Sequence, residues 1–246
     1  MTTDAHLQKT AILDFDHPTI TTLIQERGWL SLDEYGRIGA AYGFVKDEVP
    51  FGYNASDDLP ASVVLGDGLG QCNTKGNLLM ALLRALGIAC RFHGFTIHKD
   101  LQKGAIPAWL YPIAPGRILH SWVEVRHSDQ WLPLEGFILD DAYLRALQRR
   151  FPEARAFCGF GAATPNLQAP PVTWCGRATY IQREGIADDF GVFDDPDAFY
   201  GVHGTNLKGM RRWLYVHLFR HLMNRTVARI RERPTTSAES VALLER

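Results

Sequence analysis

Apolar residues recur every three or four positions in several stretches of the chain, and this spacing predicts amphipathic helices. The stretches are residues 18–27, 32–44, 142–150, 207–231 and a run that begins near Cys72 and stops at Gly87. The run after Cys72 is rich in leucine, alanine, methionine and arginine, which all favour helix. A glycine directly after the last apolar position is typical of a helix C-terminus.

Elsewhere the alternation of apolar and polar residues changes to every second position, which is typical of strands. It predicts strands over residues 89–97, 119–126 and 131–137, with a turn at 127–130 between the last two. Residues 61–65 fit either a helix or a strand. One helix followed by several strands predicts an α+β fold, in which the helix packs on an antiparallel sheet.

The chain divides into four segments that we expect to form one compact domain. Residues 1–60 form an N-terminal helical segment packed on the core, and residues 61–150 form that core. Residues 151–206 are rich in Gly, Pro and Asp and are predicted to be an irregular, loop-rich extension. Residues 207–246 comprise a basic amphipathic helix and a polar tail.

Composition and charge narrow the class of protein. The 246 residues are 46% hydrophobic and 22% charged with a net charge of −1, an ordinary globular composition that gives no reason to expect a nucleic-acid partner. Residues 207–233 carry a net charge of +7, which leaves −8 for the rest. The helix in this region either packs its apolar face on the core, which we favour, or contacts a membrane or a partner.

The cysteines and the N-terminus suggest a cytoplasmic protein with reduced thiols. The four cysteines show no C-x-x-C spacing, the N-terminus lacks an apolar signal region, and no long apolar stretch suits a membrane span. We also expect no metal and no cofactor.

The position of Cys72 is the first chemical signal. A glycine-rich stretch, residues 66–70, precedes it, and the predicted helix begins there. Free backbone N–H groups and the positive end of the helix dipole at such a position stabilise a thiolate, which suits a nucleophile. The alternative is an ordinary small buried side chain.

A nucleophilic cysteine needs a base and a group that orients the base. His120 in H-S-W-V-E-V and Glu135 in W-L-P-L-E are candidates for these roles. In an antiparallel hairpin, opposed residue numbers have a constant sum, and a sum of 255 or 257 places both side chains on one face. A sum of 256 places Glu135 on the opposite face. Asp140 is the alternative orienting carboxylate.

These motifs, A-S-V-V-L-G-D-G-L-G-Q-C-N-T-K-G-N-L-L-M-A-L-L-R-A-L-G-I-A-C-R-F-H-G-F, then H-S-W-V-E-V, then W-L-P-L-E, resemble the transglutaminase-like superfamily of cysteine enzymes. The resemblance covers about residues 61–140 and implies a papain/transglutaminase-like core with Cys72 as nucleophile, His120 as base and Glu135 as the orienting carboxylate. The family has Asp at the third position, whereas this chain has Glu.

The resemblance implies acyl transfer or amide hydrolysis through a thioester on Cys72, with a peptide, a protein or a small amide as substrate. The backbone N–H of Cys72 is the first candidate oxyanion donor, and Tyr53 and Gln71 are candidates for the second. Two alternatives stay open: a catalytically silent binding module with this fold, and an amide-forming or peptide-modifying enzyme of one pathway.

Other polar motifs have simpler interpretations. The G-x-G-x-G spacing of residues 66–70 differs from a nucleotide-binding loop and predicts a close backbone approach instead. His217 and His221 lack the Glu of H-E-x-x-H, so we expect exposed helix histidines. The acidic residues in 188–197 lack EF-hand spacing and predict a solvated loop rather than a calcium site. Residues 104–117 are loop-like and are placed to cover the active site.

Overall fold

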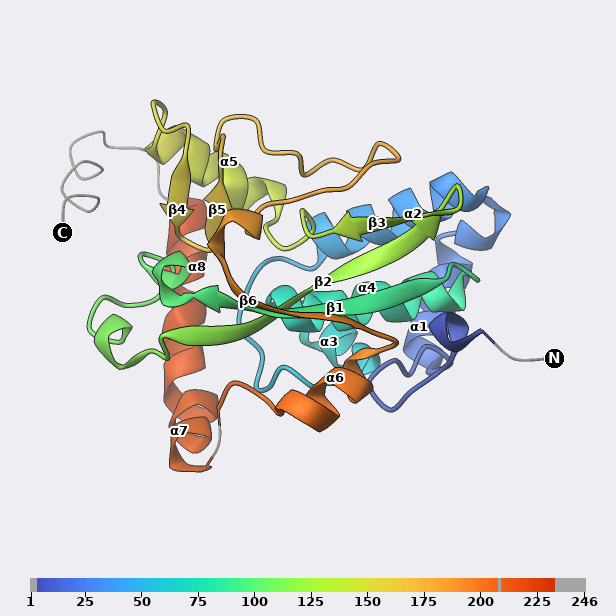
Figure 1. The fold of residues 1–246 in the computed structure, drawn as a ribbon, viewed down its shortest axis with the longest axis horizontal. Coiled ribbons are helices and arrows are strands. Elements are labelled where there is room, and N and C mark those ends of the chain that lie inside the picture. Colours follow the sequence, from blue (N-terminus) through green and yellow to red (C-terminus); the bar gives the residue numbers. More distant parts are fainter. Residues whose placement is uncertain (1–3, 208, 233–246) are drawn as a thin grey trace.

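The computed structural model describes residues 4–207 and 209–232. Its centre is a four-stranded antiparallel sheet with the strand order β3-β2-β1-β6 (Figure 1). The strands are β1 (Cys90–His98), β2 (Arg117–His127), β3 (Gln130–Leu134) and β6 (Ile186–Phe193). A short two-stranded sheet pairs β4 (Phe157–Gly159) with β5 (Ala162–Thr164). The predicted α+β class is confirmed.

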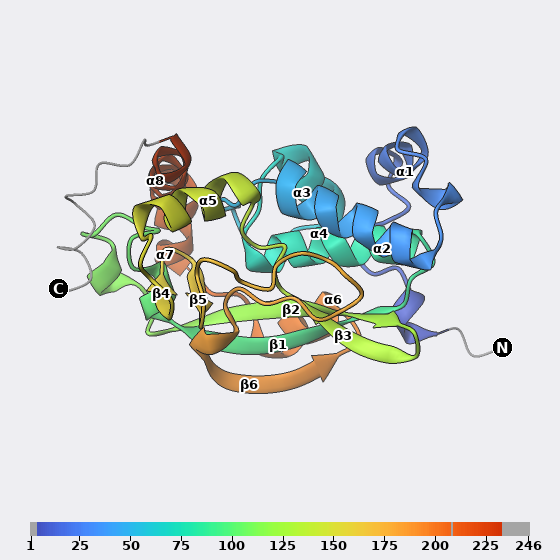
Figure 2. The same cartoon turned by 90° about the horizontal axis from the view of Figure 1, so that it is seen from above.

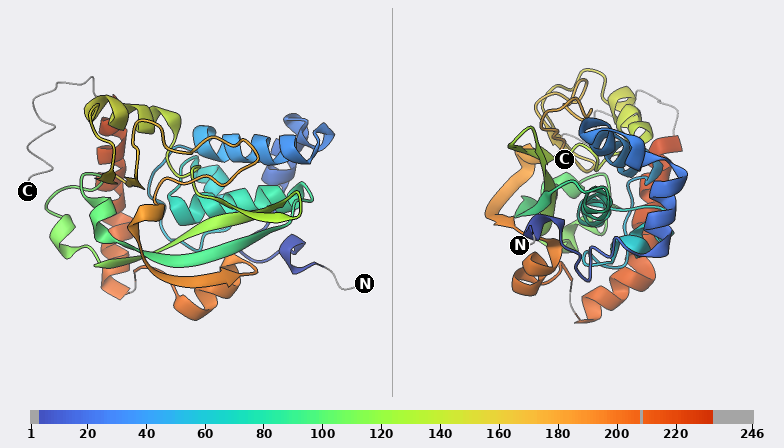
Figure 3. Two further views of the ribbon diagram at one scale, coloured as in Figure 1. Left: turned by 45° about the horizontal axis from the view of Figure 1, so that its top comes forward. Right: turned by 90° about the vertical axis from the view of Figure 1, so that its right-hand side faces the viewer.

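The central helix is α4 (Cys72–Ala85), which packs on β2 through one face. Its other sides contact the N-terminal helices, so that α4 lies between the sheet and this outer layer (Figure 2). The right-hand view of Figure 3 looks along α4 and shows it surrounded by other parts of the chain. The outer elements are α1 (Pro18–Glu26), α2 (Glu34–Gly43) and α3 (Ala61–Asp67), with the short turns η2 (Trp29–Ser31) and η3 (Phe44–Glu48). The first turn, η1 (Ala5–Leu7), instead contacts β1.

Helix α4 is buried on all sides because its apolar residues are not confined to one stripe. Leu78, Leu79, Leu82 and Leu83 are each 0% exposed, and they belong to a core cluster that includes residues from Ile12 to Ile230. The predicted helix stop is also found, since Gly87 has a φ of +75°. Residues 61–65, which the sequence left open, are helical.

The C-terminal helices stand at one end of the sheet and cross it (Figure 1). They are α7 (Gly209–Leu214), a π-helical turn η7 (Tyr215–Phe219) and α8 (Arg220–Glu232), and α8 packs on α5 (Asp141–Arg150). Met223, Val227 and Ile230 of α8 are buried in the core. The favoured interpretation of this basic helix, with its apolar face on the core, therefore agrees with the structure.

The prediction that residues 151–206 are irregular is wrong. This region contributes β4, β5, a turn η6 (Arg183–Gly185), β6 and α6 (Pro196–His203), and β6 is the edge strand beside β1. Asp188 and Asp189 interrupt the apolar alternation of β6, and its register on β1 shifts at two places. An edge strand with such irregularities lacks the two-residue period by which strands are recognised.

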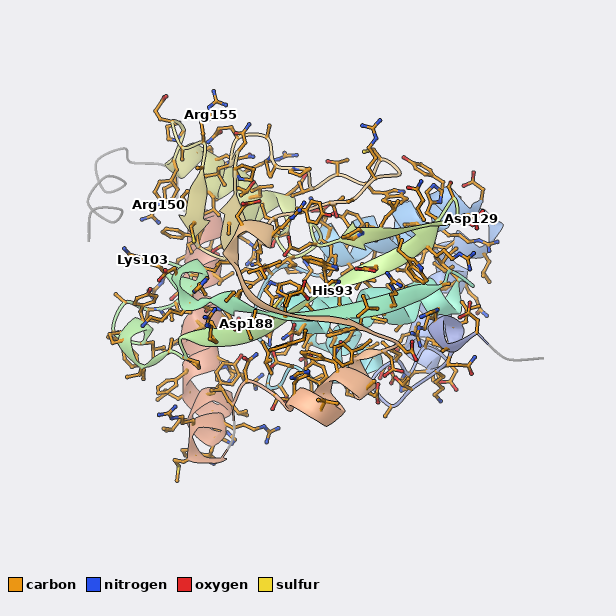
Figure 4. The ribbon with its side chains drawn as sticks, viewed as in Figure 1. His93, Lys103, Asp129, Arg150, Arg155 and Asp188 are labelled. Atoms are coloured by element: carbon orange, nitrogen blue, oxygen red, sulfur yellow. The ribbon has the colours of Figure 1, made fainter. Side chains whose placement is uncertain are left out.

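The acidic residues of β6, Asp188 and Asp189, are exposed to solvent, as predicted, but they belong to a strand and are also paired. The Asp188 carboxylate accepts a hydrogen bond from Thr96 Oγ1 at 2.7 Å, and Asp189 lies 2.8 Å from His93 Nε2. Figure 4 shows His93 and Asp188 over β1 and β6. Asp195 is the N-cap of α6 and accepts from Ala198 N–H at 2.8 Å. These contacts explain the acidic stretch as part of the fold.

Candidate active site

The site begins with Cys72, the first residue of α4. The helix start is fixed by Thr74, whose Oγ1 accepts the Gln71 N–H at 3.0 Å and donates to Asn54 Oδ1 at 2.6 Å. The preceding glycine permits a close approach, because a Cβ on Gly70 would lie 2.7 Å from the side chain of Lys75. Gly70 therefore makes the kind of close approach that the sequence predicted for residues 66–70, whereas a Cβ on Gly66 or Gly68 would have open space around it.

Hydrogen bonds attach the start of α4 to strand β2 on both sides of His120. Asn73 Nδ2 donates to Leu119 O at 3.1 Å, and Ser121 Oγ donates to Asn73 Oδ1 at 3.0 Å. Asn73 directly follows Cys72, and Leu119 and Ser121 flank His120. The backbone segments that carry the predicted nucleophile and the predicted base are thus held against each other.

The His120 ring is completely buried and stacks on Phe95 of β1, with ring centroids 4.9 Å apart. Its Nε2 contacts Gln182 Oε1, and the Gln182 amide nitrogen donates to Gly161 O. Because Gly161 O only accepts, the Gln182 oxygen must face the ring, so Nε2 carries the imidazole proton. The lone pair of the neutral ring is then on Nδ1, which accepts the Ser121 N–H at 2.6 Å.

The hairpin register satisfies the requirement derived from the sequence. Val123 pairs with Leu134 and His127 with Gln130, so opposed residue numbers sum to 257. The turn residues Ser128 and Asp129 have positive φ values of 49° and 60°, as in the two-residue turns that join twisted strands.

Glu135 is buried next to this network, but its contacts differ from the predicted ones. Its Oε2 accepts three backbone N–H groups, from Ile181 at 2.9 Å, Gln182 at 2.8 Å and Arg183 at 3.1 Å. Its Oε1 has no hydrogen-bond partner among the described residues, and burial raises the pKa of the carboxyl to about 7. The structure shows no direct hydrogen bond between Glu135 and His120. The contact with His120 that the sequence predicted for the Glu135 carboxylate is made by the Gln182 side chain instead. Glu135 accepts a hydrogen bond from the Gln182 backbone.

The alternative orienting residue, Asp140, does not serve the site. It is the N-cap of α5, with Oδ1 accepting the Tyr143 N–H at 2.9 Å, and it forms an ion pair with Arg231 at 2.5 Å. Asp140 therefore links α5 to α8.

The predicted resting thiolate is contradicted by the surroundings of Cys72. Burial, followed by the charge of Asp57, raises the pKa of the thiol, and the N–H groups of Asn73 and Cys72 offset only part of this. Burial also lowers the pKa of His120 to about 4. Both groups are therefore neutral near pH 7.

Cys72 lines a cavity of about 430 Å³, within the range of small-molecule sites. Gln182 lines the same cavity, whereas His120 lies behind Gln182 and does not reach it. The walls come from α4, from the loop between β1 and β2, and from η7 and α8. The loop contributes Ile106, Leu110 and Ile113, so residues 104–117 form one wall of the site.

The two candidates for a second oxyanion donor both line the cavity. Tyr53 OH donates to Gln102 Oε1 at 3.2 Å, and Gln71 Nε2 donates to Asp57 Oδ1 at 3.0 Å. The Tyr53 hydroxyl proton is used in this arrangement, whereas Gln71 Nε2 gives one of its two N–H groups to Asp57. His217 and His221 are exposed on the C-terminal helices. Within residues 4–207 and 209–232 there is no group of three His, Cys, Asp or Glu side chains that suits a metal ion.

Sequence reasoning missed Gln182, Asp57 and Asn206. Asp57 Oδ2 accepts from Asn206 Nδ2 at 2.9 Å, and Asn206 Oδ1 accepts the Leu119 N–H at 2.7 Å. Asp57 comes from a loop before α3, Gln182 directly precedes η6, and Asn206 lies after α6. No spacing in the sequence connects these residues with His120 or Cys72.

Comparison with known proteins agrees with this core. Residues 23–136 match the family model of the Transglutaminase-like superfamily, in agreement with the resemblance seen in the sequence motifs. A solved structure described as "a Putative Cysteine Protease from Cytophaga hutchinsonii" is similar, with a TM-score of 0.44 and 12% sequence identity. The match covers 77% of this chain and 46% of that protein's length. No curated protein matches the sequence. In the part of the chain that the structure describes, no helix has the length and apolarity that crossing a membrane requires.

Proposed function

We propose that the chain is a cysteine-dependent acyl transferase or amide hydrolase with Cys72 as nucleophile and His120 as base. The observation that carries the proposal is the attachment of the start of α4 to both neighbours of His120, at the edge of a cavity that Cys72 lines. A protonated thiol and a neutral imidazole are the correct pair for general-base catalysis, in which the proton leaves the sulfur as the bond to carbon forms.

In the proposed reaction Cys72 Sγ attacks the carbonyl carbon of an amide or ester while His120 takes the thiol proton. The tetrahedral oxyanion lies near the free N–H groups at the start of α4. The bond to the leaving group then breaks, and His120 returns the proton to the leaving nitrogen or oxygen. Water or an amine resolves the thioester. Because His120 Nδ1 accepts the Ser121 N–H in the resting structure, the step requires the ring to turn toward the sulfur.

Glu135 is a positioning residue in this proposal. Its carboxylate holds the backbone of residues 181–183, and Gln182 in turn fixes the His120 tautomer. The predicted cytoplasmic location and the choice between water and an amine as acceptor stay predictions.

The test is acylation of Cys72 by p-nitrophenyl acetate, followed by intact-protein mass spectrometry and peptide mapping. A background with Cys158→Ala and Cys175→Ala removes the two exposed thiols and leaves buried Cys90. We expect one acetyl group on Cys72, none after Cys72→Ala, and at least a hundredfold slower acylation after His120→Ala. Equal acylation rates with and without His120 would refute the proposal.

A silent binding module is the second candidate, and the absence of a direct hydrogen bond between Cys72 and His120 favours it. This candidate predicts that ligands occupy the cavity while Cys72 stays unmodified at all pH values. The acylation experiment therefore separates the two functions.

A further inference from the structure

The cavity beside Cys72 is polar at one end and apolar over the rest of its wall. Its polar side chains near the nucleophile include Gln71, Asn73, Asp57 and Asn206, which are connected by hydrogen bonds. The remaining wall is formed mainly by aliphatic and aromatic side chains from distant segments, namely Phe51, Ile97, Leu101, Ile106, Leu110, Ile118, Leu119, Leu214, Phe219 and Met223.

The apolar wall of the cavity consists of side chains that the fold packs firmly in place. Ile106 and Leu110 are 5% and 4% exposed, and Met223 of α8 is 9% exposed, so each is packed as in a core and still faces the cavity. The C-terminal helices close this side of the site, and Trp109 packs edge-on against Phe219 at 5.9 Å. These contacts join the loop between β1 and β2 to η7.

Charged side chains are rare in the lining. Asp57 lies at the polar end and is satisfied by Gln71, Asn73 and Asn206, while Arg211 and Arg212 are exposed residues of α7. A glutamine amide or a charged group placed among the aliphatic side chains would lose its hydration without gaining partners. An apolar group placed there gains the full benefit of burial.

We infer that the group transferred through Cys72 is an apolar aliphatic acyl chain, with its carbonyl at Cys72 and its chain along the aliphatic wall. This inference rests on the proposed function and assigns its substrate class. In the step, the bond between the acyl carbon and its leaving group breaks and the carbon–sulfur bond forms. The leaving group departs with the proton that Cys72 gave up, so the balance needs no further reactant.

The test measures acylation of Cys72 by p-nitrophenyl esters of two, four, six and eight carbons. Burial of each additional methylene is expected to raise kcat/KM about fourfold. The Cys72→Ala protein supplies the background rate for each ester. A glutamine-containing dipeptide amide of similar size serves as the polar donor and is expected to acylate far more slowly than the octanoyl ester.

Two variants test the location of the chain. Ile106→Phe fills the wall and is expected to reduce the advantage of the eight-carbon over the two-carbon ester at least tenfold. Ile113→Trp acts on the same wall at a position that is 63% exposed, where the fold tolerates a larger side chain more readily. Val202→Phe is the matched control, because Val202 is 73% exposed and does not line the cavity.

Equal kcat/KM values for the two-carbon and eight-carbon esters in the unmodified protein would refute the aliphatic chain and leave the proposed function standing. An unchanged chain-length preference in both wall variants would do the same. Failure of every ester to acylate Cys72 would instead refute the proposed function itself.

Discussion

The two halves of α4 are equally buried but chemically different. Asn73, Thr74, Lys75 and Asn77 in the first half are at most 1% exposed, as are Leu78, Leu79, Leu82 and Leu83 in the second half. The polar half is satisfied by hydrogen bonds to distant segments, including Lys75 Nζ to Lys46 O and to Ile138 O, both at 3.1 Å. The apolar half packs in the main core.

The chemical difference between the two halves of α4 distinguishes the residues that stabilise the fold from those that position the site. Apolar burial stabilises the folded chain at little chemical cost, whereas a buried polar group costs free energy unless all its partners are present. A helix built only for stability would be apolar along its whole length. The polar half of α4 instead uses its hydrogen bonds to position Cys72 against β2, and the predictions below separate these two roles.

The largest effect is expected from Lys75→Met, which should change how the unfolding free energy depends on pH. Burial lowers the pKa of Lys75 from 10.5 to about 7 in the folded protein. Between these values the unfolded chain binds a proton that the folded chain does not, so the Lys75 contribution to stability rises with pH. Relative to Lys75→Met, the unmodified protein should gain roughly 4 kcal/mol of unfolding free energy from pH 7 to 10.5. Urea denaturation of both proteins at several pH values measures this difference, and parallel curves would contradict it.

The second largest effect is expected from a substitution in the apolar half of α4, which should change stability but not acylation. Leu79→Ala removes a fully buried side chain from the core and should lower the unfolding free energy by about 3 kcal/mol. Because Leu79 does not line the cavity, the acylation rate of Cys72 per folded molecule should stay within about twofold. A large loss of acylation in a fully folded Leu79→Ala protein would show that the two halves are not separate.

The sequence predicted the elements whose burial is periodic. Helix α4 and strands β1, β2 and β3 were recognised because each presents a regular face to the core. The sequence left the hairpin register open, and the observed sum of 257 is one of the two that the proposed site allows. The family match over residues 23–136 agrees with the resemblance that these motifs carry. Strand β6 was missed because two aspartates and two register shifts remove its period.

The details of the site depend on information that the sequence does not carry. Gln182 reaches His120 from 62 residues away, in a segment without periodicity. The hairpin register places Glu135 on the same face as His120, as predicted. Its Oε2 nevertheless accepts hydrogen bonds from the backbone of residues 181–183 and not from His120. The raised pKa of Cys72 comes from burial and from Asp57, and neither is visible in the motif around the cysteine.

Gln182→Ala is expected to lower the acylation rate of Cys72 about a hundredfold, because the His120 tautomer is no longer fixed. The structural readout is the nitrogen NMR signal of His120, which should change from the Nε2-protonated form to a mixture. Gln182→Glu keeps an acceptor for the ring and should retain more activity, with the His120 pKa raised by the added negative charge. If Gln182→Ala leaves both the tautomer and the rate unchanged, Gln182 is only a packing residue.

The smallest effect concerns the hydrogen bond between Ser121 and Asn73 that attaches α4 to β2. Ser121→Ala removes one hydroxyl donor to Asn73 Oδ1 and should cost about 1 kcal/mol of stability. Its acylation rate should fall about threefold to tenfold, because the segments that carry Cys72 and His120 are less firmly held. A double-mutant cycle with Asn73→Ala measures the coupling directly, both in unfolding free energy and in acylation rate. Coupling in stability without coupling in acylation would mean that this contact serves the fold alone, and the contrast between the two halves of α4 would then begin at Cys72 itself.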